Sequence, residues 1–434
     1  MNSATALAER VPEVLGEHYA IVYPESQWLT TRNMRTTPLH QKWQNANAHF
    51  GQFYGWKRPL YFAKSAEPML TFNRPDWFEQ VGKEVKIAHK NAALFDQSTF
   101  GKINVKGADA ERFLNRVCAN NMTRPPGQAI YTAMLNQRGS FESDLTALRL
   151  EPEEYRLYVG TAAIRRDIAW LKCQLKNDEK VRIVDETDQY AVIGLMGPAA
   201  PLIAQSIGAV ELNSLAYFHH TASEISGVAV RGARLSYVGE PGWEITCAAT
   251  DAEAVFDALN KAGAEPAGIF AQTSMRIEKR FLVYGHDLDT DINPLQAGLG
   301  FAIDWQSDFM GRDALLALRD KPQQSTVVSI LMRETDALPL GNEPVYCDGE
   351  IIGKTTSATY GYRIGTAVAL AMVDRGSATD LEGTKVEVDI AGRLSPGSIT
   401  CKHAYDPQGT RMKGRFKTLE VDSSLRILNQ VRHD

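Results

Sequence analysis

Short segments with alternating or helically spaced hydrophobic positions follow one another along most of the chain, and they predict a mixture of strands and helices. Residues 102–107 alternate as a half-buried strand does, and residues 108–118 carry Phe113, Leu114 and Val117 on one helical face. Similar patterns predict strands at 131–135, 145–150, 190–196, 228–238 and 244–248, and helices at 164–175, 250–263 and 271–281. Thr250 and Glu253 have the spacing of a capping box. The central part of the chain is therefore predicted to be α+β.

The pattern changes near residue 324, after which no helical spacing is found. Short strands are predicted at 327–332, 344–347, 350–353, 366–373 and 385–390. Asp348 and Gly349 lie between two of them and are typical of a type I′ hairpin. We therefore expect a small all-β barrel or sandwich at the C-terminus.

The first 85 residues differ from the rest because they are rich in aromatic and proline residues and contain few periodic segments. We call residues 1–85 the arm and expect its aromatic side chains to pack against another domain or another chain. The predicted division is then 1–85 for the arm, 86–323 for an α+β body of two subdomains, and 324–434 for the β-barrel domain.

Composition and charge narrow the possible functions. The 434 residues contain 47 basic and 52 acidic side chains, and this acidic balance gives no reason to expect a nucleic-acid partner. Five cysteines without a C-x-x-C pair indicate reduced thiols and no zinc site. No secretory signal is visible, and no apolar run approaches the length of a membrane span, so we expect a cytoplasmic protein without a membrane partner.

The segment 131–146 offers a candidate catalytic carboxylate. A strand, a turn at Arg138–Gly139 and a second strand place Asp144 beside the apolar Phe141 and Leu145. A desolvated carboxylate in such a setting has a raised pKa and can act as an acid or base. A solvated carboxylate at the start of a strand is the alternative that the residues alone leave open.

Two further segments are chemically suggestive. Glu240 precedes Pro241–Gly242, a pair that predicts a type II turn, and its carboxylate could accept two N–H groups from a heterocycle edge. Arg276 and Arg280 are spaced to share one helical face and could bind an anionic ligand group. An exposed turn carboxylate and a solvated charged face are the respective alternatives.

Taken together and in order, these segments resemble the aminomethyltransferase family, which contains the glycine cleavage T-protein and the folate-binding halves of dimethylglycine and sarcosine dehydrogenases. The matching stretches are 95–117, 131–150, 160–172, 194–200, 234–245, 275–303, 309–315 and 341–373. The resemblance implies a multidomain α+β folate-binding fold with a C-terminal barrel. Ser143 and Gly160 depart from the T-protein pattern, which puts a role in glycine cleavage in doubt.

The resemblance also implies a site. Tetrahydrofolate would bind in a central opening, with Asp144 at the position of the family's catalytic aspartate and Glu240 and Arg276 at folate-contacting positions. The other positions expected to line the folate site are Tyr131, Tyr158, Tyr237 and Tyr362. No metal is expected.

The implied reaction is transfer of a one-carbon unit from an oxidised, dimethylglycine- or sarcosine-like N-methyl amine to tetrahydrofolate, giving 5,10-methylenetetrahydrofolate. Residues 19–62 look like the segment that joins the flavin half to the folate half in dimethylglycine dehydrogenases, and no dinucleotide fingerprint is present. We therefore expect a separate FAD-dependent oxidoreductase subunit as partner. The alternatives are a direct demethylase that makes 5-methyltetrahydrofolate and a non-catalytic folate-binding subunit of a flavoprotein complex.

Overall fold

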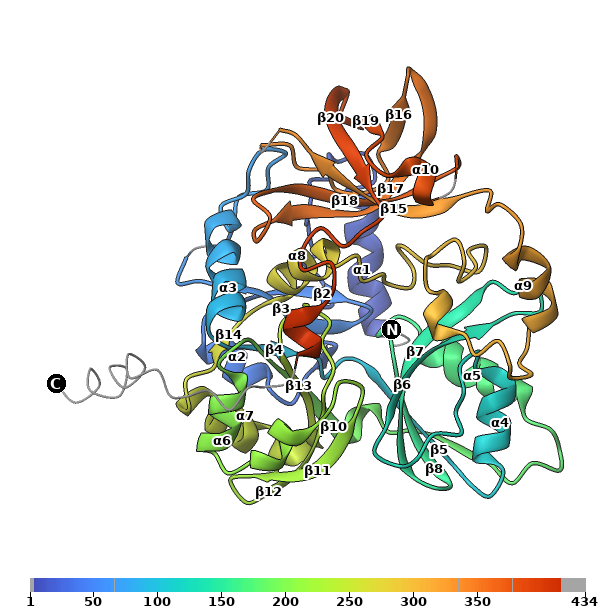
Figure 1. The fold of residues 1–434 in the computed structure, drawn as a ribbon. Helices are drawn as coiled ribbons and strands as arrows, with labels where there is room; N and C mark the ends of the chain where they lie inside the picture. The colour runs from blue at the N-terminus through green and yellow to red at the C-terminus, as the bar shows by residue number, and fades with distance from the viewer. Residues whose placement is uncertain (1–3, 66, 335, 377, 415–434) are drawn as a thin grey trace.

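A computed structural model describes residues 4–65, 67–334, 336–376 and 378–414. Three lobes are arranged around the centre of the molecule (Figure 1). The barrel lies at the top of this view, one sheet at the lower right and a second sheet at the lower left.

The first sheet confirms the strands and helices predicted between residues 101 and 174. Its order is β6 (Ala129–Leu135), β7 (Phe141–Glu151), β8 (Glu154–Val159), β5 (Gly101–Lys106) and β9 (Arg182–Asp185). Helices α4 (Ala110–Val117) and α5 (Ile164–Gln174) contribute apolar side chains to the core on one face of this sheet. Asp144 lies within β7, not at the start of a strand.

The second sheet contains six strands. Their order is β11 (His220–Ile225), β12 (Val228–Ala233), β13 (Gly242–Ala248), β10 (Tyr190–Met196), β4 (Ala93–Asp96) and β14 (Glu265–Pro266). Helices α6 (Ala200–Ser206) and α7 (Ala252–Lys261) pack on one face around the fully buried Trp243. Helix α8 (Ile269–Glu278) then leads towards the barrel, and α9 (Arg312–Arg319) precedes it.

The C-terminal domain is a closed barrel, which is one of the two all-β forms, barrel or sandwich, that the sequence predicted. The strands are β15 (Thr326–Met332), β18 (Thr366–Val373), β17 (Glu350–Gly361), β16 (Pro344–Cys347), β19 (Lys385–Ile390) and β20 (Arg393–Thr400). Asp348 and Gly349 have φ values of 53° and 81°, which fits the predicted hairpin turn. Strand β20 was not predicted because Pro396 and Gly397 are typical of a turn. The short helices α10 (Ala378–Leu381) and α11 (Thr410–Lys413) complete this region.

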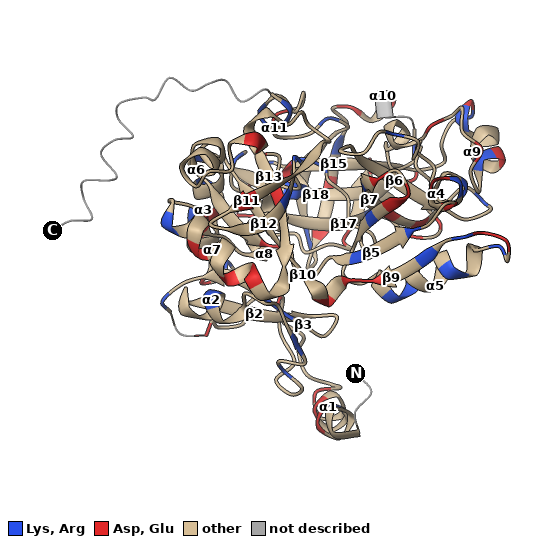
Figure 2. Cartoon of the chain, turned by 90° about the horizontal axis from the view of Figure 1, so that it is seen from below, with Lys and Arg blue, Asp and Glu red and all other residues tan. Residues whose placement is uncertain are grey.

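The arm is more regular than its sequence predicts. It contains α1 (Ala4–Gly16), β1 (Arg35–Thr36), α2 (His40–Asn45), β2 (Ala48–Phe53), β3 (Trp56–Phe62) and the start of α3 (Phe78–Lys90). Strands β1, β3 and β2 form a small sheet, and Trp43 enters the core of the second large sheet. The expected boundary at residue 85 falls inside α3. Helix α1 alone stands away from the body (Figure 2).

Two local predictions are wrong. Gly242 has φ 154° and already begins β13, so residues 240–243 do not form a type II turn. A side chain at Gly242 is excluded, since a Cβ would lie 2.0 Å from the carbonyl oxygen of Leu195. The capping box at Thr250 is also absent, because a 3₁₀ turn at Ala249–Asp251 makes Asp251 the N-cap of α7, without a side-chain capping bond. Among the described helices, none is long and apolar enough to cross a bilayer.

Candidate active site

The first sheet presents polar side chains on the face opposite its helices. On β7, Leu145 and Ala147 point into the helix-covered core, so Asp144 lies on the other face. On β8, Leu157 belongs to the same core, and Tyr158 lies opposite. Period-two alternation of these strands therefore gathers the candidate residues on one surface.

The second sheet faces that surface with polar groups of its own. Trp243, Ile245 and Cys247 enter the core beneath α6 and α7, so Glu244 and Thr246 point away from it. The Tyr158 hydroxyl lies 2.8 Å from the Thr246 hydroxyl and joins the two sheets. The candidate site thus lies where the polar faces of two sheets meet.

Asp144 has the environment expected of an acid–base group. Its Oδ2 accepts a hydrogen bond from the Tyr131 hydroxyl at 3.0 Å. Burial raises the pKa of Asp144 from 3.8 to about 6, although the Tyr131 hydrogen bond and Arg166 oppose this rise. The carboxylate is therefore ionised at neutral pH and able to bind a proton at slightly lower pH.

The neighbouring Ser143 binds a second carboxylate, that of Asp167 on α5. Its hydroxyl donates to Oδ2 of Asp167 at 2.6 Å, and Arg166 pairs with Oδ1 of Asp167 at 3.0 Å. The charge on Asp167 contributes to the raised pKa of Asp144. Ser143 therefore supports the electrostatics of the site through Asp167.

Tyr237 is within electrostatic reach of Asp144 and of Arg276. Its hydroxyl donates to the carbonyl of Leu282 at 3.2 Å. Burial raises the pKa of Tyr237, Arg276 opposes the rise, and Asp144 adds to it. Arg276 itself is buried and pairs with Asp287 at 2.7 Å, so its guanidinium is anchored to the protein.

Glu240 lies in a different cluster. Its carboxylate is fully buried and pairs with Arg363 at 2.9 Å and with Arg411 at 2.7 Å. The Tyr405 hydroxyl also donates to it at 3.0 Å. These contacts join the second sheet, the barrel and α11, and they occupy both carboxylate oxygens.

Tyr362 also lies apart from Asp144. Its hydroxyl donates to the carbonyl of Phe78 at 2.7 Å, and its ring packs against Gly82 of α3. The structure therefore joins Asp144 to Tyr131 and places Tyr158 on the same face of the sheet. Asp144 and Arg276 both act electrostatically on Tyr237, and Glu240 and Tyr362 lie in structural contacts elsewhere.

Glu244 and Gln97 are polar groups of this site that the sequence reasoning missed. Burial raises the pKa of Glu244 to about 7, although the Gln97 amide donates to it at 3.3 Å and opposes the rise. Oε1 of Gln97 and the hydroxyl of Ser236 are buried without a hydrogen-bond partner among the described residues. The polar position between Trp243 and Ile245 on a buried strand was the available signal for Glu244. These groups fit a planar ligand with donors and acceptors on its edge.

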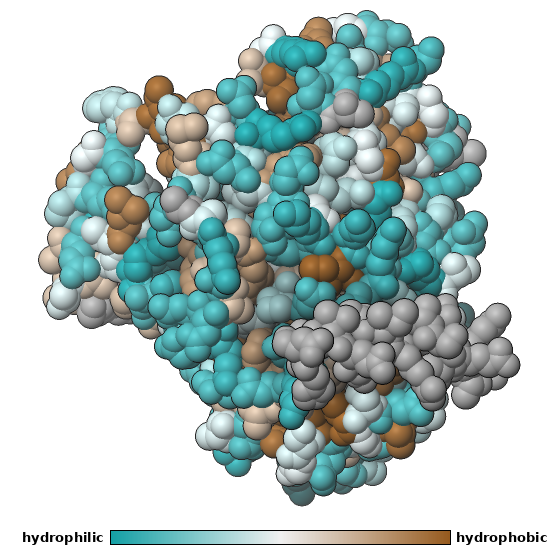
Figure 3. Space-filling view, turned by 90° about the vertical axis from the view of Figure 1, so that its left-hand side faces the viewer, coloured by the Kyte–Doolittle hydropathy of each residue, from teal (hydrophilic) through white to brown (hydrophobic). Residues whose placement is uncertain are grey.

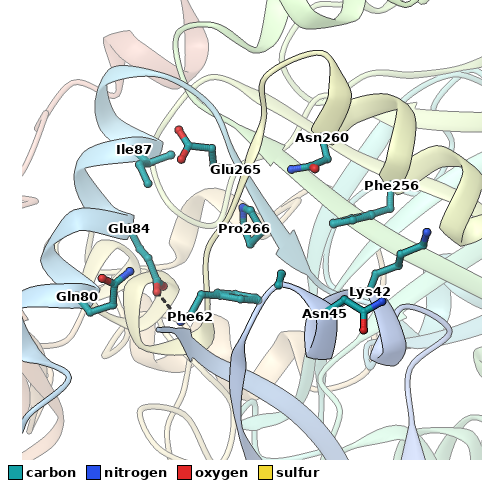
Figure 4. Close-up of a pocket in the computed structure, with 11 residues that line it drawn as sticks. Lys42, Asn45, Phe62, Gln80, Glu84, Ile87, Phe256, Asn260, Glu265 and Pro266 are labelled. Carbon is teal, nitrogen blue, oxygen red and sulfur yellow. Dashed lines mark hydrogen bonds between the residues drawn. The ribbon is translucent and has the colours of Figure 1, made fainter. Parts of the chain in front are cut away.

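A pocket of about 490 Å³ lies between residues of the arm, α7 and β14 and is shown in Figure 4. It is lined by Lys42, Asn45, Ala46, Phe62, Gln80, Glu84, Ile87, Phe256, Asn260, Glu265 and Pro266. None of the predicted site residues belongs to it. The molecular face in Figure 3 is mainly hydrophilic, with scattered hydrophobic side chains. Within the described ranges, no cluster of His, Cys, Asp or Glu side chains is arranged to hold a metal ion.

Comparison with known families and proteins covers nearly the whole chain. Residues 39–307 match the GCVT N-terminal domain, and residues 326–406 match the glycine cleavage T-protein C-terminal barrel domain. Residues 1–37 match the FAD dependent oxidoreductase central domain.

Two similar proteins are oxidising enzymes about twice as long. The chain is 34% identical to 4-methylaminobutanoate oxidase (formaldehyde-forming) of Paenarthrobacter nicotinovorans, with 95% of this chain and 51% of that protein covered. It is 31% identical to mitochondrial dimethylglycine dehydrogenase of Homo sapiens, with 89% and 46% covered. The chain therefore spans about half the length of these relatives.

Two other similar proteins are aminomethyltransferases and match over almost their full length. The chain is 32% identical to the aminomethyltransferase of Thermotoga petrophila, with 86% of this chain and 98% of that protein covered. The crystal structure of glycine cleavage system aminomethyltransferase T from Bartonella henselae has a TM-score of 0.76 at 24% identity, covering 86% and 99%. The resemblance and the fold class predicted from the sequence are thereby confirmed: the chain belongs to the aminomethyltransferase family and is homologous to the dimethylglycine dehydrogenases.

Proposed function

We propose that this chain transfers a one-carbon unit from an oxidised N-methyl amine to tetrahydrofolate, giving 5,10-methylenetetrahydrofolate. The observation that carries the proposal is Asp144, with its raised pKa and its Tyr131 partner, on the polar face that Tyr158 joins to the strand of Glu244. We assign the chemical step to the carboxylate of Asp144 and ligand binding to the carboxylate of Glu244. The family to which the chain belongs supports folate as the ligand.

Glu244 and Gln97 are the groups we assign to the pterin ring. A pterin edge offers an amino group and a ring N–H side by side, which a carboxylate accepts as a pair. Glu244 has one described hydrogen-bond donor, and Oε1 of Gln97 has none, so both retain acceptor capacity. Both carboxylate oxygens of Glu240 are engaged by protein donors, and we therefore transfer its expected role to Glu244.

Asp144 is the residue we assign to the chemical step. In the transfer, N5 and N10 of tetrahydrofolate would each form a bond to the carbon of the oxidised amine, the bond from that carbon to the amine nitrogen would break, and the amine would leave with the two N–H protons. Ionised Asp144 would accept a hydrogen bond from one of these N–H groups, orient it, and stabilise the positive charge that develops as the bond forms. The Tyr131 hydroxyl, at 3.0 Å, holds the carboxylate in position.

We further propose that the arm binds an FAD-dependent oxidoreductase that supplies the oxidised amine. Helix α1 is joined to residues 29–31 by polar groups, since Arg10 donates to Thr31 and Glu13 accepts from Thr30. Its apolar side chains are exposed, with 70% of Leu15 and 48% of Val11 accessible. The same segment matches a domain of FAD-dependent oxidoreductases, which supports this partner.

The catalytic proposal is tested by Asp144→Asn. With tetrahydrofolate and formaldehyde, the native chain should form 5,10-methylenetetrahydrofolate faster than the spontaneous reaction, and Asp144→Asn should lose at least ~90% of that excess rate. Glu142→Gln removes a charge two residues away on the same strand and should retain the rate. An unchanged rate in Asp144→Asn contradicts the assignment, and formation of 5-methyltetrahydrofolate from a methylated donor would replace the reaction with demethylation.

The partner proposal is tested by Leu15→Glu. Co-expressed with an FAD-dependent oxidoreductase subunit, the native chain should elute together with flavin absorbance, and Leu15→Glu should elute without it. Glu9→Lys changes charge on an exposed position of the same helix and should preserve the complex. Separate elution of the native chain and the flavoprotein would contradict the proposed complex.

A further inference from the structure

We propose that Arg58, on β3 of the arm, binds the carboxylate group of a ligand held at the Asp144 site. The inference rests on the proposed function and extends it to a group that determines ligand specificity. Arg58 lies on the central strand of the arm's sheet, opposite Gly51 of β2. The arm therefore contributes to the site as well as to the partner contact.

The guanidinium of Arg58 lacks a protein partner. Its Nε is buried without a hydrogen-bond acceptor, and across the described ranges the rest of the group makes no hydrogen bond or ion pair. Other buried arginines of the molecule are paired: Arg276 with Asp287, Arg363 with Glu240 and Arg156 with Glu186, at 2.7, 2.9 and 2.9 Å. A half-buried charge without a counterion is costly, which indicates that Arg58 is kept for a ligand.

The nearby carboxylate of Asp96 does not act as the counterion of Arg58. Desolvation lowers the pKa of Arg58, and Asp96 opposes the change, so the two are within electrostatic reach. The oxygens of Asp96 are already used, because Oδ2 accepts from Thr37 and Trp43 at 2.6 Å each. Its Oδ1 accepts the backbone N–H of Ser98 at 3.0 Å. Asp96 thus has no contact with the arginine.

The strand register places Arg58 beside residues of the candidate site. Arg58 and Thr37 directly follow the paired residues Lys57 and Thr36, and the Thr37 hydroxyl donates to Asp96, which directly precedes Gln97 of the site. Arg58 and Asp144 also both act electrostatically on Tyr237. A ligand whose reacting nitrogen lies at Asp144 can therefore extend an anionic group towards Arg58. A carboxylate is the natural counterpart of the planar guanidinium fork, since two parallel hydrogen bonds can form.

Two ligands of the proposed reaction carry a carboxylate: an N-methyl amino acid and the glutamate tail of tetrahydrofolate. Arg58→Met separates them in binding titrations against paired probes that have or lack the carboxylate. The folate pair is tetrahydrofolate and tetrahydropteroate, and the donor pair is sarcosine and dimethylamine, both measured with the folate site saturated. Lys57→Met is the matched control, because it removes a positive charge from the adjacent position, where the ammonium lies over the ring of Phe50 at 4.9 Å.

We expect Arg58→Met to weaken binding of one carboxylate-bearing probe at least ~10-fold and to leave its carboxylate-free partner unchanged. Loss with tetrahydrofolate assigns the glutamate tail, and loss with sarcosine assigns the amino acid. Arg58→Met should also keep or raise the melting temperature, because it removes an unpaired charge, whereas loss of a structural arginine would lower it.

The inference is overturned if both carboxylate probes bind Arg58→Met as they bind the native chain, or if the carboxylate-free probes weaken equally. It fails together with the proposed function if the native chain binds no tetrahydrofolate. If the native chain binds tetrahydrofolate and Arg58→Met changes nothing, the inference alone fails.

Discussion

Replacement of Asp144 by asparagine should stabilise the folded protein while it removes the proposed chemistry. Burial raises the pKa of Asp144 from 3.8 to about 6, so the folded chain holds this proton more tightly than the unfolded chain does. Well below pH 3.8 both states are protonated and no penalty arises. As the pH rises towards 6, the unfolded chain ionises first, and the folded state loses stability relative to it. Above pH ~6 the penalty is constant.

The size of this effect follows from the pKa difference. The rise to about 6 corresponds to roughly 3 kcal/mol. Because the side chain is only half-buried, solvent screening reduces the expected gain to about 1–2 kcal/mol. Asparagine keeps the acceptor for the Tyr131 hydroxyl and carries no charge, so the contact at 3.0 Å can be retained.

Calorimetric unfolding at pH 8 and at pH 4 measures the effect. We expect the melting temperature of Asp144→Asn to exceed that of the native chain by about 2 °C at pH 8, with a clearly smaller difference at pH 4. Glu142→Gln, which removes a carboxylate two residues away on the same strand, should show no comparable gain. A melting temperature at pH 8 equal to or below that of the native chain would refute a desolvated carboxylate at this position.

Three other predictions concern the support of the site. Glu84→Ala should lower the free energy of unfolding by about 2–4 kcal/mol in denaturant titration, since two buried backbone N–H groups lose their acceptor; a neutral result would contradict this. Gly242→Ala should destabilise by a similar ~2–4 kcal/mol because its Cβ would meet the Leu195 carbonyl, and normal melting would refute that. Tyr131→Phe removes a hydrogen bond that lowers the pKa of Asp144, so the acidic limb of the pH–rate profile should move up by about 0.5–1 pH unit; an unmoved limb would contradict the contact.

Much of the fold could be predicted because apolar periodicity reflects which face of each element is buried. The alternation at 190–196 and the helical spacing from Ile164 specify elements whose observed bounds, Tyr190–Met196 and Ile164–Gln174, agree closely. Strand β20 was not predicted because Pro396 and Gly397 are typical of turns, and only the tertiary packing of the barrel allows them within a strand. The strands of the arm were not predicted because contacts with the body stabilise them, and local sequence patterns do not encode such contacts.

The candidate site was predictable only in part. The resemblance to the family pointed to Asp144, where the residues alone left a solvated carboxylate as the alternative, and period-two alternation explains why Tyr158 shares its face. The use of Glu240 could not be foreseen, since its partners Arg363 and Arg411 are more than 120 residues away in the sequence. Long-range ion pairs of this kind are set by tertiary structure, and the nearby turn signal gave no information on them.

Anaerobic calorimetric titration with tetrahydrofolate tests the central claim most directly. We predict one saturable site in the native chain, binding at least ~10-fold weaker in Glu244→Gln, which loses a charged acceptor, and unchanged binding in Glu265→Gln, a lining residue of the separate pocket. The absence of saturable binding to the native chain, or equal affinity in both variants, would contradict a reduced pterin bound between the two sheets.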